Sequence, residues 1–513
     1  MLARVNSSTV AGIDAVLVDV EVDVSFGLPG FTIVGLPENS VRESRDRVKS
    51  AVRNSGYSFP PDKITVNLAP ADIKKEGTGF DLPVAMGILA ASGMIPDNPL
   101  GRYALVGELS LDGRVKPVTG ILPSAMAIAD SGLAGIILPF ENRIEASVVQ
   151  GLDAIPVASL SQAVEFLCGR QSIEPFVMDM GTLVGKGALD ETMDFSEVMG
   201  QYHAKRALEI SAAGNHSLLM TGPPGSGKTM LAKRLATILP GMTSREALET
   251  TRIYSVAGLL RDSLPLVTRR PFRAPHHTVS EAGLVGGGLK PAPGEISLAH
   301  NGILFLDELP EFRRSTLEVL RQPLEEKSVA LSRAGHRTRY PADFVLVAAM
   351  NPCPCGHWGN PLRECTCTQA QIQRYRARIS GPLLDRMDIH IEVPQVPFAD
   401  MTVKEPAESS AAIRARVEAA RRIQTDRFKE TAALCNARMT PGQIKAFCRL
   451  EPDARSVLGM AMDRLGFSAR AHNSILKIAR TIADLDGSRD ILRQHVLEAI
   501  QYKDLDRRIP GDI

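Results

Sequence analysis

A glycine-rich segment that ends in a lysine and a threonine could hold the phosphates of a nucleotide. Residues 222–229 read GPPGSGKT and fit the pattern G-x-x-x-x-G-K-[ST]. Glycines let such a loop turn its backbone N–H groups toward phosphate oxygens. Lys228 would place its charge at the β- and γ-phosphates, and Thr229 would offer its hydroxyl to Mg²⁺. We therefore assign nucleotide binding to the whole loop: Gly222, Pro223, Pro224, Gly225, Ser226, Gly227, Lys228 and Thr229.

Two apolar runs later in the chain are each followed by polar residues, which could complete a hydrolytic site. Asp307 and Glu308 directly follow the apolar run 303–306, and Asn351 directly follows the run 344–350. We expect Asp307 to bind Mg²⁺, Glu308 to polarise the attacking water, and Asn351 to orient that water. Two acids after a strand could merely cap a helix, but the phosphate loop favours the hydrolytic interpretation.

Four of the chain's 7 cysteines lie close together after the second of these runs. They form two C-x-C pairs that together offer enough thiolates for a tetrahedral Zn²⁺ site: Cys353, Cys355, Cys365 and Cys367. His357 between the pairs is an alternative ligand, and reduced thiols without a metal are the other interpretation. An odd number of cysteines and an N-terminus without a secretory segment predict a reducing, cytoplasmic location.

Such residues must be positioned by a sheet whose strands end at one edge. The apolar run 218–220 before the phosphate loop predicts a strand, and residues 230–239 after it predict a helix. Alternating strand and helix patterns then predict a parallel sheet with helices on both faces, an α/β fold. We expect five segments along the 513-residue chain: an α/β domain at 1–170, a linker at 171–190, the nucleotide-binding core at 191–395 with a cysteine insert at 353–367, a helical connector at 396–440 and a C-terminal helical lid at 441–513.

Charge and hydropathy limit the possible partners. No apolar run reaches the roughly 18 residues that a membrane span needs, so we expect no membrane partner. The net charge of +1 gives no general affinity for nucleic acid, which leaves local clusters. One basic cluster flanks a hairpin signal at Ala334-Gly335 and could follow DNA phosphates without reading sequence: Arg333, His336, Arg337 and Arg339. A plain solvated turn is the other interpretation.

The order of phosphate loop, acidic pair and polar-tipped strand resembles that of AAA+ ATPases. The stretch VMGQYHAKRAL resembles that family's Gly-Gln box, which contacts the adenine side of ATP, at Gly200 and Gln201. ISGPLLDRMDIHIEVP resembles the arginine-finger segment of the magnesium chelatase and replicative MCM branch, which implies a finger at Arg386. GFSARAHNSILKIARTIADL resembles the sensor-2 helix of the lid, which implies a role for Arg470. Each arginine could instead be a solvated surface residue.

Nearly the whole chain resembles the YifB/ComM family of magnesium chelatase-like AAA+ proteins, on stretches such as GIDAVLVDVEVDVSFGLPGFTIVGLPENSVRESRDRV and RAPHHTVSEAGLVGGG. The resemblance implies a homo-oligomeric ring, a hexamer, because a finger acts on a neighbour's γ-phosphate. It implies that ATP and Mg²⁺ drive branch migration of forked or branched DNA, with a single strand in the pore, during recombination and natural transformation. The alternative is a chelatase-like or chaperone-like ATPase that remodels a protein client.

The N-terminal segment resembles the proteolytic domain of Lon, on KKEGTGFDLPVAMGILAASG and VGELSLDGRVKPVTGILPSAMAIAD. Lon-type proteases need a serine nucleophile and a lysine that takes its proton. Gly79 occupies the serine position and Ala125 the lysine position, and Ser124 beside it is not a base. The resemblance therefore implies a Lon/S5-domain-2-like α/β fold without peptidase activity. The residues leave its role open, and we expect DNA contact or ring assembly.

Overall fold

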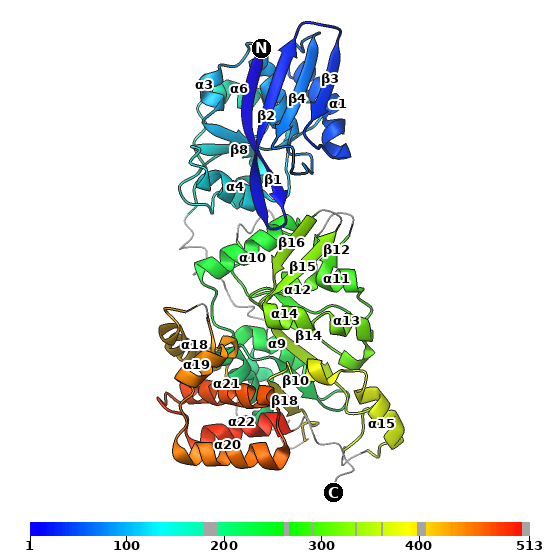
Figure 1. Cartoon of the computed structure of the whole chain (residues 1–513), viewed down its shortest axis with the longest axis vertical. Coiled ribbons are helices and arrows are strands. Elements are labelled where there is room, and N and C mark those ends of the chain that lie inside the picture. Colours follow the sequence, from blue (N-terminus) through cyan, green and yellow to red (C-terminus); the bar gives the residue numbers. More distant parts are fainter. Residues whose placement is uncertain are drawn as a thin grey trace. The chain divides into compact units, whose positions relative to one another are not determined.

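The computed structural model in Figure 1 divides the chain into two compact units, each with its own sheet. The first unit comprises Met1–Lys186, Thr243–Thr268 and Ser332–Tyr340, and the second comprises Gly187–Met242, Arg269–Leu331 and Pro341–Ile513. The structure describes residues 1–178, 193–260, 266–288, 292–333, 336–360, 363–397, 407–431 and 433–504.

The first unit is built on a seven-stranded sheet in the order β3-β4-β2-β1-β5-β8-β9. Alternate residues of β2, among them Val18, Val20 and Val22, are completely buried, as expected where one face of a strand packs on a core. The fully buried helix α2 covers that face and contributes to the same core. The strands are β1 (Leu2–Ala11), β2 (Asp14–Ser25), β3 (Gly30–Val34), β4 (Lys63–Ala69), β5 (Tyr103–Leu105), β8 (Gly135–Pro139) and β9 (Asp153–Val157), with the short pair β6 (Glu108–Leu109) and β7 (Val115–Lys116) beside them. The helices are α1 (Asn39–Asn54), α2 (Asp81–Ala91), α3 (Asp97–Leu100), α4 (Ile121–Asp130), α5 (Arg143–Ala146) and α6 (Leu160–Leu167).

A helix from the middle of the sequence also belongs to the first unit. Helix α10 (Ser244–Val256) begins with a capping box at Thr243 and packs against α4. Ser255 donates a hydrogen bond to the buried Glu145 carboxylate at 2.5 Å, and Arg252 donates to the carbonyl of Ile13 at 3.2 Å. Residues 243–260 and 266–268 lie inside the predicted nucleotide-binding core in sequence, yet they pack with the N-terminal α/β elements.

The second unit contains a five-stranded parallel sheet in the order β11-β14-β17-β10-β18. Along β17, Val345, Val347 and Ala349 enter one hydrophobic core while the alternate residues enter a second core on the opposite face. A strand buried on both faces is an uninterrupted apolar run, which is how β14 and β17 read in the sequence. The strands are β10 (Leu218–Thr221), β11 (Phe272–Arg273), β14 (Ile303–Leu306), β17 (Val345–Met350) and β18 (Ile389–Glu392). The predicted parallel α/β core is therefore confirmed.

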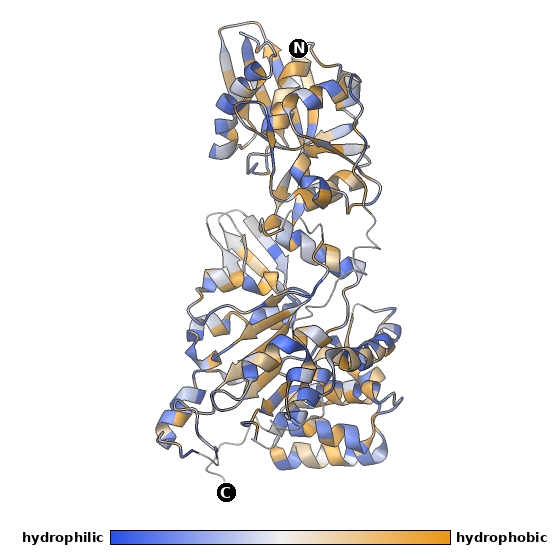
Figure 2. Cartoon of the chain, turned by 180° about the vertical axis from the view of Figure 1, so that it is seen from behind, coloured by the Kyte–Doolittle hydropathy of each residue, from blue (hydrophilic) through white to orange (hydrophobic). Residues whose placement is uncertain are grey.

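Helices cover both faces of this sheet. Helices α8 (Tyr202–Gly214) and α9 (Lys228–Ile238) pack on one face together with the C-terminal helices. The other face carries α11 (Glu281–Val285), α12 (Glu295–Leu298), α13 (Arg314–Glu318), α14 (Arg321–Glu326), α15 (Gln369–Arg376) and α16 (Gly381–Leu384). Figure 2 shows hydrophobic residues along the strands and hydrophilic residues on the outer sides of the helices.

The predicted C-terminal helical region is also observed. It contains α18 (Ser410–Arg427), α19 (Pro441–Phe447), α20 (Pro452–Leu465), α21 (Ala469–Leu485) and α22 (Arg493–Asp504). A buried carboxylate joins α18 to α21: Asp484 accepts hydrogen bonds from Arg427 at 2.5 Å, from Arg480 at 3.0 Å and from Asn436 at 2.8 Å. None of the helices that the structure describes is long and apolar enough to span a lipid bilayer.

Replacing Asp484 with Ala should loosen these helices. The substitution leaves two guanidinium groups buried without their carboxylate, which costs roughly 3–5 kcal/mol. We expect that loss in the opening free energy of α21, measured by amide hydrogen exchange on the intact chain. Asp463→Ala on the exposed side of α20 is the matched control and should change it by less than about 0.5 kcal/mol. Equal effects of the two substitutions would contradict the role given to Asp484.

Candidate active site

The phosphate loop joins the end of β10, near the middle of the parallel sheet, to the first turn of α9. Gly225 and Gly227 have φ angles of 75° and 89°, a left-handed conformation that glycine adopts without strain. At Gly222 a Cβ would lie 2.2 Å from the carbonyl oxygen of Val393, so only glycine fits. The loop therefore presents the N-terminus of a long helix, where partial positive charge favours phosphate.

Lys228 is buried and binds the loop that it follows. Its Nζ donates to the carbonyl oxygens of Gly222 at 2.7 Å and Pro223 at 2.9 Å, and to Asn351 Oδ1 at 3.3 Å. Burial lowers the pKa of Lys228, while the charge of Asp307 acts in the opposite direction. Lys228 thus connects the phosphate loop to the polar end of β17.

The hydroxyl of Ser226 indicates whether the loop suits a phosphate. Ser226 Oγ is buried and has no hydrogen-bond partner among the described residues. A buried hydroxyl without a partner is costly unless a ligand or water satisfies it. Together with the glycine conformations, this orphaned group fits a loop that closes around a phosphate.

Two oxygen ligands meet beside the loop. Thr229 Oγ1 donates to Asp307 Oδ2 at 2.6 Å, although the residues come from α9 and from the end of β14. The other oxygen of Asp307 accepts the backbone N–H of Glu308 at 2.9 Å. A hydroxyl and a carboxylate at one point suit Mg²⁺, which keeps few protein ligands and shares the nucleotide phosphates.

Glu308 stands at the end of β14 in a conformation unusual for its residue type. Its φ angle is 53°, and 60% of its side chain is exposed. His277 Nδ1 lies 3.6 Å from Glu308 Oε2, and the rings of His276 and His277 have centroids 4.0 Å apart. Sequence reasoning gave His277 no role here. A signal existed, because β11 precedes it and lies beside β14, so polar residues after both strands reach the same edge.

The Gly-Gln box contacts the segment that follows β18. Gly200 and Gln201 both have positive φ angles, of 58° and 54°. Gln201 Nε2 donates to the carbonyl oxygen of Pro394 at 2.6 Å, and Pro394 lies two residues after the end of β18, the neighbour of β10. The box is therefore held beside the strand that leads into the phosphate loop.

The two predicted arginines converge on one carboxylate. Arg386 Nη2 lies 2.6 Å from Glu325 Oε1, and Arg470 forms an ion pair with the same oxygen. Arg386 follows α16 and Arg470 lies on α21, so two distant segments supply the pair. Among the described residues neither guanidinium hydrogen-bonds to the phosphate loop. Glu325 was missed, since a glutamate on a helix carries no sequence signal of this kind.

The basic hairpin forms a two-stranded sheet of β15 (Ser328–Arg333) and β16 (His336–Pro341). Arg339 is exposed on β16. The hairpin tip at 334–335 lies outside the described residues, as do the side chains of Arg333, His336 and Arg337. Their contact with DNA stays a prediction.

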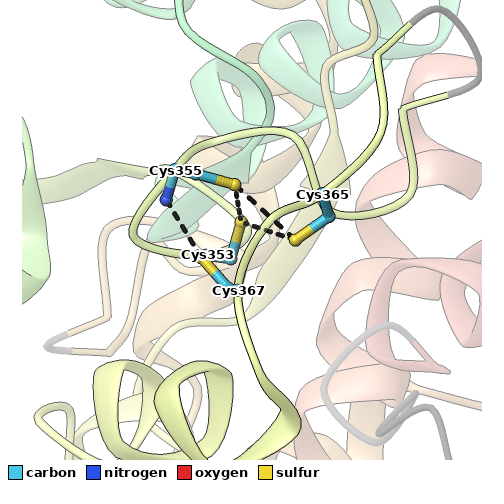
Figure 3. Close-up of side chains that lie close together, drawn as sticks. All are labelled: Cys353, Cys355, Cys365 and Cys367. Carbon is cyan, nitrogen blue, oxygen red and sulfur yellow. Dashed lines mark hydrogen bonds between the residues drawn. The ribbon is translucent and has the colours of Figure 1, made fainter.

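The four clustered cysteines lie together in a loop between β17 and α15 (Figure 3). Their sulfur atoms all lie within 4.8 Å of one another, and Cys353 is completely buried. His357, the alternative ligand, is not part of this cluster. The arrangement has the composition and size of a four-thiolate metal site.

The Lon-like positions carry no reactive groups in the first unit. A Cβ at Gly79 would lie 3.2 Å from Val106 Cγ1, so a serine there would press on the core. Ala125 is completely buried in α4, and Ser124 donates to the carbonyl oxygen of Gly120 at 2.9 Å.

Comparison with known families matches three parts of the chain. Residues 194–401 match the family described as magnesium chelatase, subunit ChlI, and residues 407–503 match its C-terminal part. Residues 20–142 match the family described as subunit ChlI of Mg-chelatase. These matches cover the parallel sheet, most of the C-terminal helices and part of the first unit.

Individual proteins match over almost the full length. The chain is 47% identical to the protein YifB of Escherichia coli over 510 residues, 99% of this chain and 98% of YifB. It is 45% identical to the competence protein ComM of Haemophilus influenzae over 509 residues, 98% of this chain and 97% of ComM. A shorter stretch of 141 residues, 26% of this chain and 24% of the other, is 30% identical to Lon protease 2 of Bacillus subtilis.

Replacing Lys228 with Met should weaken MgATP binding roughly 10- to 100-fold, because it removes the charge that faces the phosphates. Titration of a fluorescent ATP analogue with the purified chain measures the effect. Lys233→Met removes an exposed lysine from the same helix and should leave the affinity unchanged. The assignment fails if both variants bind as the unaltered chain does.

Proposed function

The chain belongs to the YifB and ComM family of magnesium chelatase-like AAA+ proteins, and we propose that it is a ring-forming ATPase that drives branch migration of DNA. The observation that carries the proposal is the meeting of Lys228, Thr229, Asp307 and Asn351 at one edge of the parallel sheet. A passive scaffold has no use for such an arrangement. ATP is the substrate and Mg²⁺ the cofactor that this family implies.

Each residue would have a separate task in hydrolysis. Lys228 would exchange its loop carbonyls for the β- and γ-phosphate oxygens. Thr229 and Asp307 would hold Mg²⁺, which would supply positive charge to the phosphates. Glu308 accepts a proton from the attacking water, and Asn351 orients that water. The exposed Glu308 carboxylate lies 3.6 Å from His277 Nδ1 and can turn toward the water.

The two arginines would complete the site of a neighbouring copy. Arg386 and Arg470 share Glu325 and do not bind their own phosphate loop among the described residues. A γ-phosphate from the next subunit carries more negative charge than one carboxylate, so it can replace Glu325 as their partner. Hydrolysis would then require a ring, which we propose to be a hexamer.

DNA is the proposed substrate of movement. One relative, from Haemophilus influenzae, is named a competence protein, which supports a role in recombination and natural transformation for this chain. The hairpin of β15 and β16 carries Arg333, His336, Arg337 and Arg339 in a compact basic segment. We propose that it contacts the backbone of single-stranded DNA in the pore.

The remaining assignments follow from the cysteines and from the first unit. All 7 cysteines are free, which suits a reducing, cytoplasmic location, and four of them would hold Zn²⁺. Without a serine at 79 or a lysine at 125, the Lon-like α/β unit would not cleave peptides. We propose that it serves DNA contact or ring assembly.

A second candidate function is remodelling of a protein client. The matched families are described as subunits of magnesium chelatase, so a chelatase-like or chaperone-like motor is the specific alternative. The response of ATP hydrolysis to forked DNA distinguishes the two candidate functions. For a DNA motor, ATP hydrolysis by the purified chain should rise when forked DNA is added, and the rise should fade with salt because phosphate contacts release counterions. No response to forked DNA, together with stimulation by a protein client, would favour the alternative.

Replacing Glu308 with Gln should separate binding from hydrolysis. The amide cannot take the proton from water, so the turnover rate should fall roughly 100- to 10,000-fold while MgATP affinity stays unchanged. Measured turnover and nucleotide affinity on one preparation give both quantities. Glu311→Gln, an exposed neighbour, is the control and should keep normal turnover. A Glu308→Gln variant that still moves branched DNA at the normal rate would refute the catalytic assignment.

A further inference from the structure

The geometry of the cysteine cluster is that of a metal site. The Sγ atoms of Cys353 and Cys355 are 3.3 Å apart. The Sγ atom of Cys365 lies 3.7 Å from that of Cys353 and 3.6 Å from that of Cys355. Four sulfurs at about 2.3 Å from Zn²⁺ form a tetrahedron with edges of about 3.8 Å. A disulfide would need about 2.05 Å. The separations therefore suit thiolates around one cation.

Backbone donors support the sulfurs as they do around bound metals. Cys355 N–H donates to Cys367 Sγ at 3.4 Å, and Trp358 N–H donates to Cys353 Sγ at 3.3 Å. Such bonds fix the direction of thiolate ligands and offset part of their charge. Figure 3 shows Cys353 and Cys355 facing Cys365 and Cys367 across the loop, so both ends of the loop are joined at one point.

The loop depends on this cluster for its conformation. Among the described residues 351–360 and 363–368 there is neither helix nor strand between β17 and α15. An irregular segment of this kind has few backbone hydrogen bonds of its own and needs a cross-link to hold one conformation. Gly356, between the ligands, has a φ of 79° and donates its N–H to the carbonyl oxygen of Cys353 at 3.0 Å.

The same turn lies directly against the phosphate loop. A Cβ at Gly356 would lie 2.5 Å from Cδ and 2.8 Å from Cγ of Pro224, so backbone and proline ring are packed without room for a side chain. Pro224 is the third residue of the loop 222–229 that would surround the phosphates. A displacement of the cysteine turn would therefore move Pro224 and so change the nucleotide pocket.

We propose that Cys353, Cys355, Cys365 and Cys367 bind one Zn²⁺ and that this ion holds the phosphate loop in its nucleotide-binding conformation through Gly356 and Pro224. Zinc occupancy then sets the affinity for MgATP. The proposal rests on the nucleotide site proposed above, and it adds a second, structural metal that controls that site. The segment also leads through α15 and α16 to Arg386, so the ion fixes the start of the chain that presents the trans-acting arginine.

Zinc content tests the site itself. The purified full-length chain should contain one Zn²⁺ per chain by elemental analysis, and Co²⁺ in its place should give the absorption of tetrahedral thiolate coordination. Cys365→Ser should lower the content to near zero, whereas Cys168→Ser in the first unit should keep it. Trp358 is the chain's 1 tryptophan, so its fluorescence reports metal binding within the loop. A chain that takes up neither Zn²⁺ nor Co²⁺ would overturn the site.

Two glycine variants test the coupling without touching a ligand. Gly356→Ala should keep zinc and bind a fluorescent ATP analogue roughly 10-fold more weakly, because the new methyl group displaces Pro224. Gly359→Ala is the matched control: its φ of 75° imposes similar backbone strain in the same loop, yet nothing lies within 4 Å of the added Cβ. It should keep both zinc and affinity.

The outcomes separate this proposal from the proposed function. Zinc bound normally with no nucleotide binding by the unaltered chain would refute the ATPase assignment but not the metal site. Unchanged nucleotide affinity in both the zinc-free Cys365→Ser variant and Gly356→Ala would overturn the coupling. If Cys365→Ser does not fold, the nucleotide affinities of Gly356→Ala and Gly359→Ala still show whether the cysteine turn is coupled to the nucleotide pocket.

Discussion

The alignment of three neighbouring parallel strands is the constraint on which the active site depends. β14, β17 and β10 end at one edge of the sheet, and each is followed by a residue that carries chemistry: Asp307, Asn351 and the phosphate loop. The hydrogen bonds of Lys228 to Asn351 and of Thr229 to Asp307 exist only because the strands keep this register. The register in turn is fixed by side chains buried on both faces of the sheet.

Two further features follow β17 in the chain: the cysteine loop beside the phosphate loop, and the segment that leads to Arg386. On one side the cysteine loop leaves β17 and packs on Pro224 of the phosphate loop. Further along the same segment, Arg386 meets Arg470 at Glu325. One continuous stretch therefore begins at the subunit's own nucleotide pocket and ends at the arginine proposed to act on a neighbour's pocket. In the proposed ring, this stretch would connect nucleotide binding to the contact with the neighbouring copy.

Much of this arrangement is local, and the sequence predicted it well. The phosphate loop, the strands before Asp307 and Asn351, and the cysteine pairs are short patterns whose spacing requires one backbone geometry. What sequence reasoning missed is non-local: Glu325 between two arginines, His277 beside Glu308, and Gly356 against Pro224. The packing of α10 with the N-terminal elements was also missed, because its amphipathic pattern does not say which surface it will cover.

We propose that neighbouring copies share a nucleotide pocket, and complementation between two inactive variants measures this sharing. A chain with Arg386→Ala keeps Glu308, and a chain with Glu308→Gln keeps Arg386. When the two are mixed under conditions in which rings assemble, pockets with an intact Glu308 receive an intact arginine from the neighbour, and ATP hydrolysis should return. Hydrolysis at the normal rate by the Arg386→Ala chain alone, or a mixture as inactive as its components, would contradict the claim.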